Sequence, residues 1–67
     1  MEAVIVYETK LNSINKLTVE IEENFNNEFS VLAYDEEGGV FVEKFAPTFE
    51  KAKEVAEKLH NKIVKEY

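Results

Sequence analysis

The spacing of apolar residues changes once along this chain, at Pro47, and that change narrows the folds open to it. Before Pro47, short polar clusters separate apolar stretches of strand length, and residues 16–23 alternate cleanly between apolar and polar side chains. After Pro47, apolar residues recur at the spacing of one side of an α-helix. Proline stops a strand, and Thr48 is a suitable helix N-cap. The pattern therefore predicts an α+β fold, with an antiparallel sheet followed by one C-terminal amphipathic helix.

We expect about four strands, in the order ββββα, over residues 2–9, 16–23, 29–34 and 40–45. A chain of 67 residues has room for one domain, spanning residues 1–67. The clearest hairpin loop is Asp-Glu-Glu-Gly-Gly at 35–39, because glycine supplies the positive φ that such loops need. The apolar stripe of the helix comprises Phe49, Ala52, Val55, Ala56, Leu59, Ile63 and Tyr67. The order of the strands in space does not follow from the pattern.

Three of the four expected strands carry apolar residues on both faces, and a single helix cannot shield both faces from water. A helix is about 10 Å wide and strands lie about 4.8 Å apart, so one helix covers two or three strands on one face. The second face would include Val6, Leu32, Tyr34 and Phe41. Either the sheet curls over these side chains or they meet another chain. We favour a partner, because so small a chain encloses little core.

The formal net charge of −6 is concentrated in the expected sheet. Residues 1–47 hold ten carboxylates and three lysines, whereas the rest of the chain holds four carboxylates and five lysines. Such a sheet repels a phosphate backbone and attracts cationic partners. Glu20 and Glu22 lie two apart on one strand and so share a face. They form either a solvated strand face or a row of carboxylates that meets a basic groove on a partner.

The residue types of most catalytic and metal sites are scarce in this chain. It has no cysteine and a single histidine, His60, which excludes disulfides, thiolate metal sites and His-pair zinc sites. The acidic residues 35–37 lack the spacing of a calcium loop. No nucleophile stands near a base, and we interpret His60 as a residue at the edge of the core. We therefore expect no enzyme, no metal and no cofactor.

The expected location is the cytoplasm. No apolar run approaches the roughly 20 residues that span a bilayer, so we expect no membrane partner. The apolar run at residues 3–7 follows Glu2 and has no basic segment before it, which is not typical of a signal peptide.

The stretch from Phe29 to Tyr67 contains a strand, a hairpin turn at 35–39, then Phe45, Thr48 and a helix. This layout resembles the DNA-binding domains of arm-type integrases. The resemblance implies a nucleic-acid-binding module that reads DNA with basic and aromatic residues of the sheet face. Here that surface offers three glutamates and the chain has no arginine, so nucleic-acid binding is the alternative hypothesis.

The main hypothesis is a small, acidic, non-enzymatic interaction module. It would bind another protein or itself, with a homodimer as the expected form of self-association, through the face or the edge of the sheet. A small regulator or inhibitor, of the type that a phage or mobile element encodes, fits this description. The expected apolar anchors are Tyr7, Leu32, Tyr34 and Phe41, and the expected charged surroundings are Glu20, Glu22 and Glu43.

Overall fold

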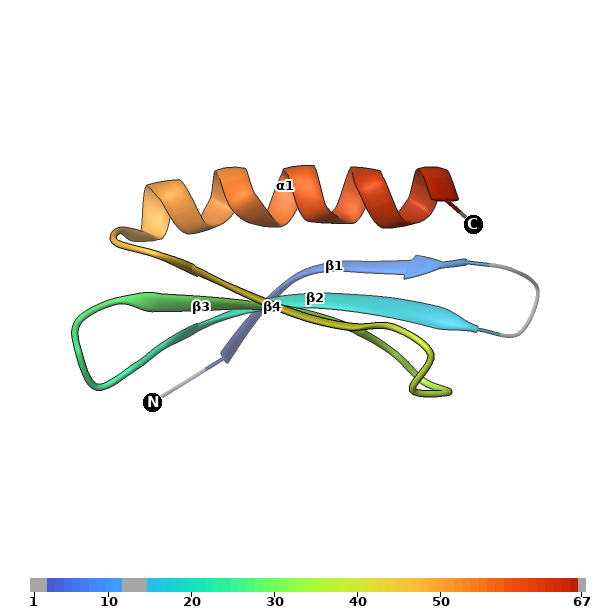
Figure 1. The fold of residues 1–67 in the computed structure, drawn as a ribbon, viewed down its shortest axis with the longest axis horizontal. Helices are drawn as coiled ribbons and strands as arrows, with labels where there is room; N and C mark the ends of the chain where they lie inside the picture. Colours follow the sequence, from blue (N-terminus) through green and yellow to red (C-terminus); the bar gives the residue numbers. More distant parts are fainter. Residues whose placement is uncertain (1–2, 12–14, 67) are drawn as a thin grey trace.

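The computed structural model describes residues 3–11 and 15–66 and has the predicted α+β fold. The elements are β1 (Ala3–Lys10), β2 (Lys16–Glu23), β3 (Phe29–Asp35), β4 (Phe41–Ala46) and α1 (Phe49–Glu66). The predicted strands differ from these bounds by at most one residue at either end. The strands lie in the order β1-β2-β3-β4, with each antiparallel to its neighbours. Helix α1 lies along one side of this sheet (Figure 1).

The core lies between α1 and the side of the sheet that α1 covers. On β2, Leu17, Val19 and Ile21 are at most 1% exposed, which is the alternation predicted for that strand. Helix α1 contributes small side chains where it is most deeply buried, since Ala52 and Ala56 are also at most 1% exposed. The core consists of Leu17, Val19, Ile21, Val31, Ala33, Val40, Ala46, Ala52, Ala56, Leu59 and Ile63. Each large side chain among them contributes roughly 1.5–3 kcal/mol through burial.

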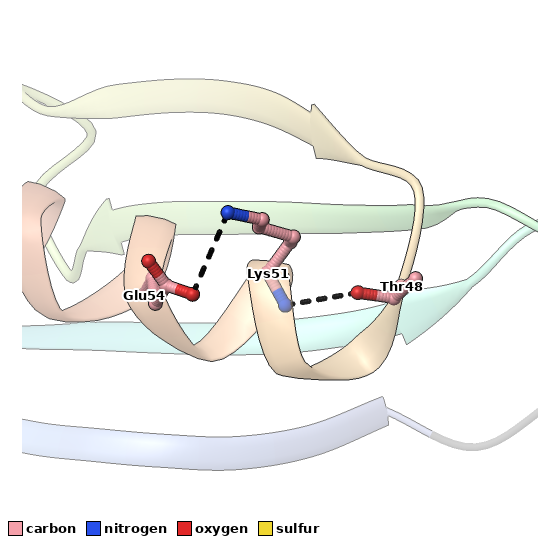
Figure 2. Close-up of polar contacts among 3 residues, drawn as sticks. All are labelled: Thr48, Lys51 and Glu54. Carbon is pink, nitrogen blue, oxygen red and sulfur yellow. Dashed lines mark hydrogen bonds and ion pairs between the residues drawn. The ribbon is translucent and has the colours of Figure 1, made fainter.

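The helix begins where the sequence predicts. Thr48 is the N-cap, and its Oγ1 accepts a hydrogen bond of 3.1 Å from the backbone N–H of Lys51 (Figure 2). The Nζ of Lys51 lies 3.9 Å from Oε2 of Glu54. This ion pair is exposed and contributes little to stability. The first residue of the helix, Phe49, is 37% exposed and packs edge-to-face on Phe29, with 5.8 Å between the ring centroids. Tyr67, the last residue of the predicted stripe, lies outside the described residues.

A β-bulge in β1 changes which side chains share a face. Strict alternation predicts Tyr7 on the same face as Ile5, but the pairing of β1 with β2 shifts between these two residues. Ile5 pairs with Glu20, and Tyr7 pairs with Val19. Val6 is the extra residue of the bulge, and both Val6 and Tyr7 pack against the core. The prediction that Val6 belongs to the second, uncovered face is therefore wrong.

Asp35 organises the end of the sheet where β3 turns into β4. It was predicted to belong to the hairpin loop, but it is the last residue of β3 and is 7% exposed. Its carboxylate accepts hydrogen bonds from Nδ2 of Asn15, at 2.8 Å, and from the backbone N–H of Val40, at 3.0 Å. These bonds hold the pKa of Asp35 below its usual value of 3.8, and the bond from Asn15 has the largest effect. Gly38 supplies the positive φ of the loop, at 77°.

The lowered pKa of Asp35 predicts a specific dependence of stability on pH. The charged carboxylate stabilises the fold above its unfolded-state pKa, and this contribution is lost as the pH falls through the lower folded-state value. We therefore expect Asp35→Asn to destabilise the fold at pH 6. The difference in unfolding free energy between this variant and the original chain should shrink as the pH falls below about 4, the ordinary pKa of an aspartate. Urea unfolding at several pH values measures both curves. Glu37→Gln, the same kind of change in the exposed part of the loop, serves as the control, and parallel curves for the original chain and Asp35→Asn would contradict the prediction.

Candidate functional site

The side of the sheet that faces away from α1 is the candidate site, and we call it the open face. Cross-strand partners point to the same side of a sheet, so the strand register defines its members. These are Ala3, Ile5, Glu8, Thr18, Glu20, Glu22, Ser30, Leu32, Tyr34, Phe41, Glu43 and Phe45. Among the described residues no helix or strand lies over this side, because the one helix occupies the opposite side (Figure 1).

The open face mixes apolar and acidic side chains in three rows across the sheet. The middle row runs Ile5, Glu20, Leu32, Glu43, and the row towards the β2–β3 turn runs Ala3, Glu22, Ser30, Phe45. The remaining row runs Glu8, Thr18, Tyr34, Phe41. Neighbours within a row are about 4.8 Å apart, and rows are about 6.8 Å apart. Every carboxylate therefore has an apolar side chain within reach.

Three large apolar side chains of the open face are mostly exposed to solvent. Ile5 is 53% exposed, Phe41 68% and Phe45 61%. Thr18 and Ser30, on the two central strands of the same face, are buried because larger side chains flank them. The exposed apolar groups thus stand on the outer strands β1 and β4, and the partly buried Leu32 and Tyr34 lie between them on β3. Several large apolar side chains exposed on one face are typical of an interaction site.

Tyr34 and Glu20 form a fixed polar contact on the open face. The hydroxyl of Tyr34 donates a hydrogen bond of 2.6 Å to Oε1 of Glu20. This bond is the main reason that the pKa of Tyr34 is raised above 10.0, with smaller contributions from burial and from the charges of Glu20 and Glu8. The phenol therefore stays protonated at neutral pH. The contact orients one carboxylate of the face and covers part of its centre.

The charge of the open face is unbalanced within its three rows. They contain four glutamates and no lysine, and the lysines on the same side, Lys10 and Lys16, lie at one end of the sheet. The row pattern places Glu20 and Glu22 roughly 7 Å apart along β2. In the described part of the chain, the ion pairs formed by glutamates are on α1 and none is on this face. The face therefore presents acidic groups that are available to a cationic partner.

Six of the seven residues predicted as interface residues share the open face. They are Glu20, Glu22, Leu32, Tyr34, Phe41 and Glu43. The seventh, Tyr7, lies on the covered side because of the bulge, so it does not join them. Sequence reasoning left out Ile5, Phe45 and Glu8. For Ile5 and Phe45 the signal was present, since each occupies an alternate position on a strand with apolar residues on both faces.

Tyr7 instead forms a contact with His60 on the covered side. Their rings stack with 4.2 Å between centroids and 14° between planes. The Thr9 hydroxyl and Nε2 of His60 form a hydrogen bond of 2.8 Å, and Nδ1 of His60 lies 3.3 Å from Oδ1 of Asn61. The contact holds α1 against the outer strand β1. This position, half-buried beside the core, agrees with the interpretation of His60 as an edge-of-core residue.

Two shallow hollows lie elsewhere on the molecule. One, of about 330 Å³, is lined by Val4, Ile21, Glu23, Phe29 and Phe49. The other, of about 200 Å³, is lined by Lys44, Val55, Lys58, Leu59 and Lys62. The first has one titratable side chain in its lining, Glu23, and the titratable side chains that line the second are all lysines. Within residues 3–11 and 15–66, no three side chains of the His, Cys, Asp and Glu types gather so that they could hold a metal ion.

Neither sequence nor fold comparison connects this chain to a known protein. It matches no protein-family model, no curated protein and no solved structure. In the part of the chain that the structure describes, α1 is too polar to cross a membrane.

Proposed function

We propose that this chain is a non-enzymatic interaction module whose open face binds a partner protein. The observation that supports the proposal is the uncovered side of the sheet, where Ile5, Phe41 and Phe45 stand exposed among four glutamates. Aromatic side chains are typical anchors of protein interfaces, and the surrounding charges set the choice of partner.

The face of the sheet is a better docking surface than its edges. The β1 edge carries the bulge at Val6, which disturbs the ladder that an added strand would need. The β4 edge carries Lys44, which points to the side covered by α1. Bulges and inward-pointing lysines are the usual means by which edge strands avoid pairing with other chains. Of the two modes expected from the sequence, this favours binding through the face.

The charge of the open face favours a cationic protein over a second copy of this chain. A face-to-face homodimer would bring eight glutamates together, four from each copy, and like charges at close range oppose association. A partner with lysine or arginine side chains between apolar groups would satisfy both kinds of side chain. The same glutamates oppose contact with a phosphate backbone, so the proposal does not include nucleic-acid binding.

A peptide of matched chemistry tests the proposal. Acetyl-KTLTKTLTK-amide presents alternating lysine and leucine on one side of an extended strand. We expect it to shift the backbone amide signals of β2, β3 and β4 in a ¹⁵N–¹H titration while α1 stays unchanged. The counterpart with glutamate in place of lysine should not bind. Combining Phe41→Ser with Phe45→Ser should weaken binding by at least about fivefold, the loss typical of removing interface anchors.

Three results would count against the proposal. Shifts confined to α1, or equal binding of the basic and acidic peptides, would mean that the open face is not the docking surface. Light scattering of the chain alone, at several concentrations, provides the second measurement. A stable dimer of the original chain that is lost in Phe41→Ser would remove the preference for a cationic partner over self-association through this face.

A further inference from the structure

Phe25 is the most exposed large apolar side chain in the described part of the molecule. It is 94% exposed, against 68% for Phe41, the next in order. It stands in the turn between β2 and β3, which is otherwise polar. Exposure at this level leaves the ring without packing partners, so Phe25 has no role in the core. The fold itself does not explain why an aromatic residue occupies this position.

The turn that carries Phe25 is held by several hydrogen bonds. Oδ1 of Asn24 accepts bonds from the backbone N–H groups of Asn26, at 3.0 Å, and Glu28, at 3.2 Å. The N–H of Asn24 donates to the carbonyl of Glu28 at 2.9 Å, and Asn27 has a positive φ of 60°. A side chain on such a turn loses less freedom on binding than one on a loose loop. Phe25 is therefore presented by a preorganised backbone.

The turn adjoins the open face. It follows the end of β2 and precedes β3, next to the row that contains Glu22, Ser30 and Phe45. In Figure 1 this turn, drawn in teal to green, bends away from α1. The rows of the open face span roughly 20 Å by 20 Å, about 400 Å² in projection. A typical interface buries about 800 Å² per partner, so the open face alone is small for stable binding.

We propose that Phe25 is an anchor of the same interface and enters an apolar pocket rimmed by cationic groups on the partner. This inference rests on the proposed function of the open face. The surroundings of Phe25 are acidic, because Glu23 and Glu28 flank the turn and are both exposed. Cationic groups around the partner's pocket would complement these two carboxylates. The addition of Phe25 extends the binding surface beyond the sheet. It also sets the chemistry of the partner: a basic surface with one apolar pocket near its margin.

Heptakis(6-amino-6-deoxy)-β-cyclodextrin reproduces that chemistry, because it has an apolar cavity that takes phenyl rings and a rim of ammonium groups. In a ¹⁵N–¹H titration we expect it to shift residues 24–28 at lower concentration than the signals around Phe41 and Phe45. It should bind about threefold more tightly than neutral β-cyclodextrin, and 0.5 M salt should remove the difference. Phe25→Ser should abolish the shifts at residues 24–28.

Matched variants separate preorganisation from simple exposure. Asn24→Ala removes the side-chain acceptor that holds the turn and should weaken binding about fivefold while Phe25 remains in place. Asn26→Ala lies in the same turn, where its backbone N–H donates to Asn24, and should bind like the original chain. The double change Glu23→Gln with Glu28→Gln should reduce binding to that of neutral β-cyclodextrin.

The outcomes of this titration differ from those of the peptide experiment. Equal affinity for the charged and neutral cyclodextrins, or binding at Phe41 and Phe45 ahead of Phe25, would overturn the role of Phe25. The open face could still bind the basic peptide in that case. If the basic peptide also fails, both the proposed function and the role of Phe25 are rejected.

Discussion

Replacement of Ile21 by alanine is expected to lower the free energy of unfolding by about 3 kcal/mol. Ile21 is 1% exposed, lies on the covered side of β2 and faces the core under α1. Its truncation removes buried apolar contacts and leaves a cavity that a small core cannot readily fill. A loss of this size is a large part of the total stability of a domain with 67 residues.

Ile5 provides the matched control, because it is the same residue type on the opposite side of the sheet. It is 53% exposed and belongs to the open face. We expect Ile5→Ala to cost less than about 1 kcal/mol, since much of its side chain is already in water. Urea unfolding of the original chain and both variants gives the comparison. Similar losses for Ile5 and Ile21 would mean that both faces of the sheet are buried in solution, through self-association or a different fold.

Removal of charge from the open face is expected to strengthen self-association of the chain. The variant carries Gln in place of Glu8, Glu20, Glu22 and Glu43, which raises the formal net charge from −6 to −2. Glutamine keeps the shape of each side chain and can still accept the hydrogen bond from Tyr34. Without this repulsion, the exposed apolar groups of two copies can meet. We expect a dissociation constant in the micromolar to millimolar range, which corresponds to a free energy of association of about −4 to −8 kcal/mol.

The same charge change on the helix is the control for this result. Gln in place of Glu50, Glu54, Glu57 and Glu66 also gives a net charge of −2, but all four positions are exposed on α1. We expect this variant to remain monomeric in sedimentation equilibrium at all concentrations. If both variants associate equally, net charge governs solubility and the open face has no special role. If neither associates, repulsion is not what keeps two open faces apart.

Local patterns predicted most of the elements of this fold because their causes are local. Alternation on β2 and the helical spacing after Pro47 reflect which side of an element faces the core. The N-cap at Thr48 depends on the backbone of the next three residues and was also predictable. The conclusion that one helix leaves one face of the sheet uncovered needed only the dimensions of helices and strands.

The positions that sequence reasoning missed depend on contacts between distant residues. Tyr7 lies on the covered side because a bulge shifts β1 against β2, and nothing near Tyr7 in the sequence indicates that shift. The local sequence is typical of a loop at Asp35, and it does not show that Asn15, twenty positions earlier, lies beside the Asp35 carboxylate. Phe25 reads as one aromatic residue in a polar turn, and its 94% exposure follows from how the Asn24 side chain folds that turn.

The sequence by itself determined the class of the fold, the ends of its elements and the excess of apolar side chains over what one helix can cover. These follow from the hydrophobic effect acting on repeating patterns, where each residue is sorted by its own neighbours along the chain. The tertiary structure decided the strand order, the face of Tyr7, the contact of Asp35 with Asn15 and the grouping of glutamates with exposed aromatics. Register between strands sets these, and register is a property of pairs of segments that no single segment contains.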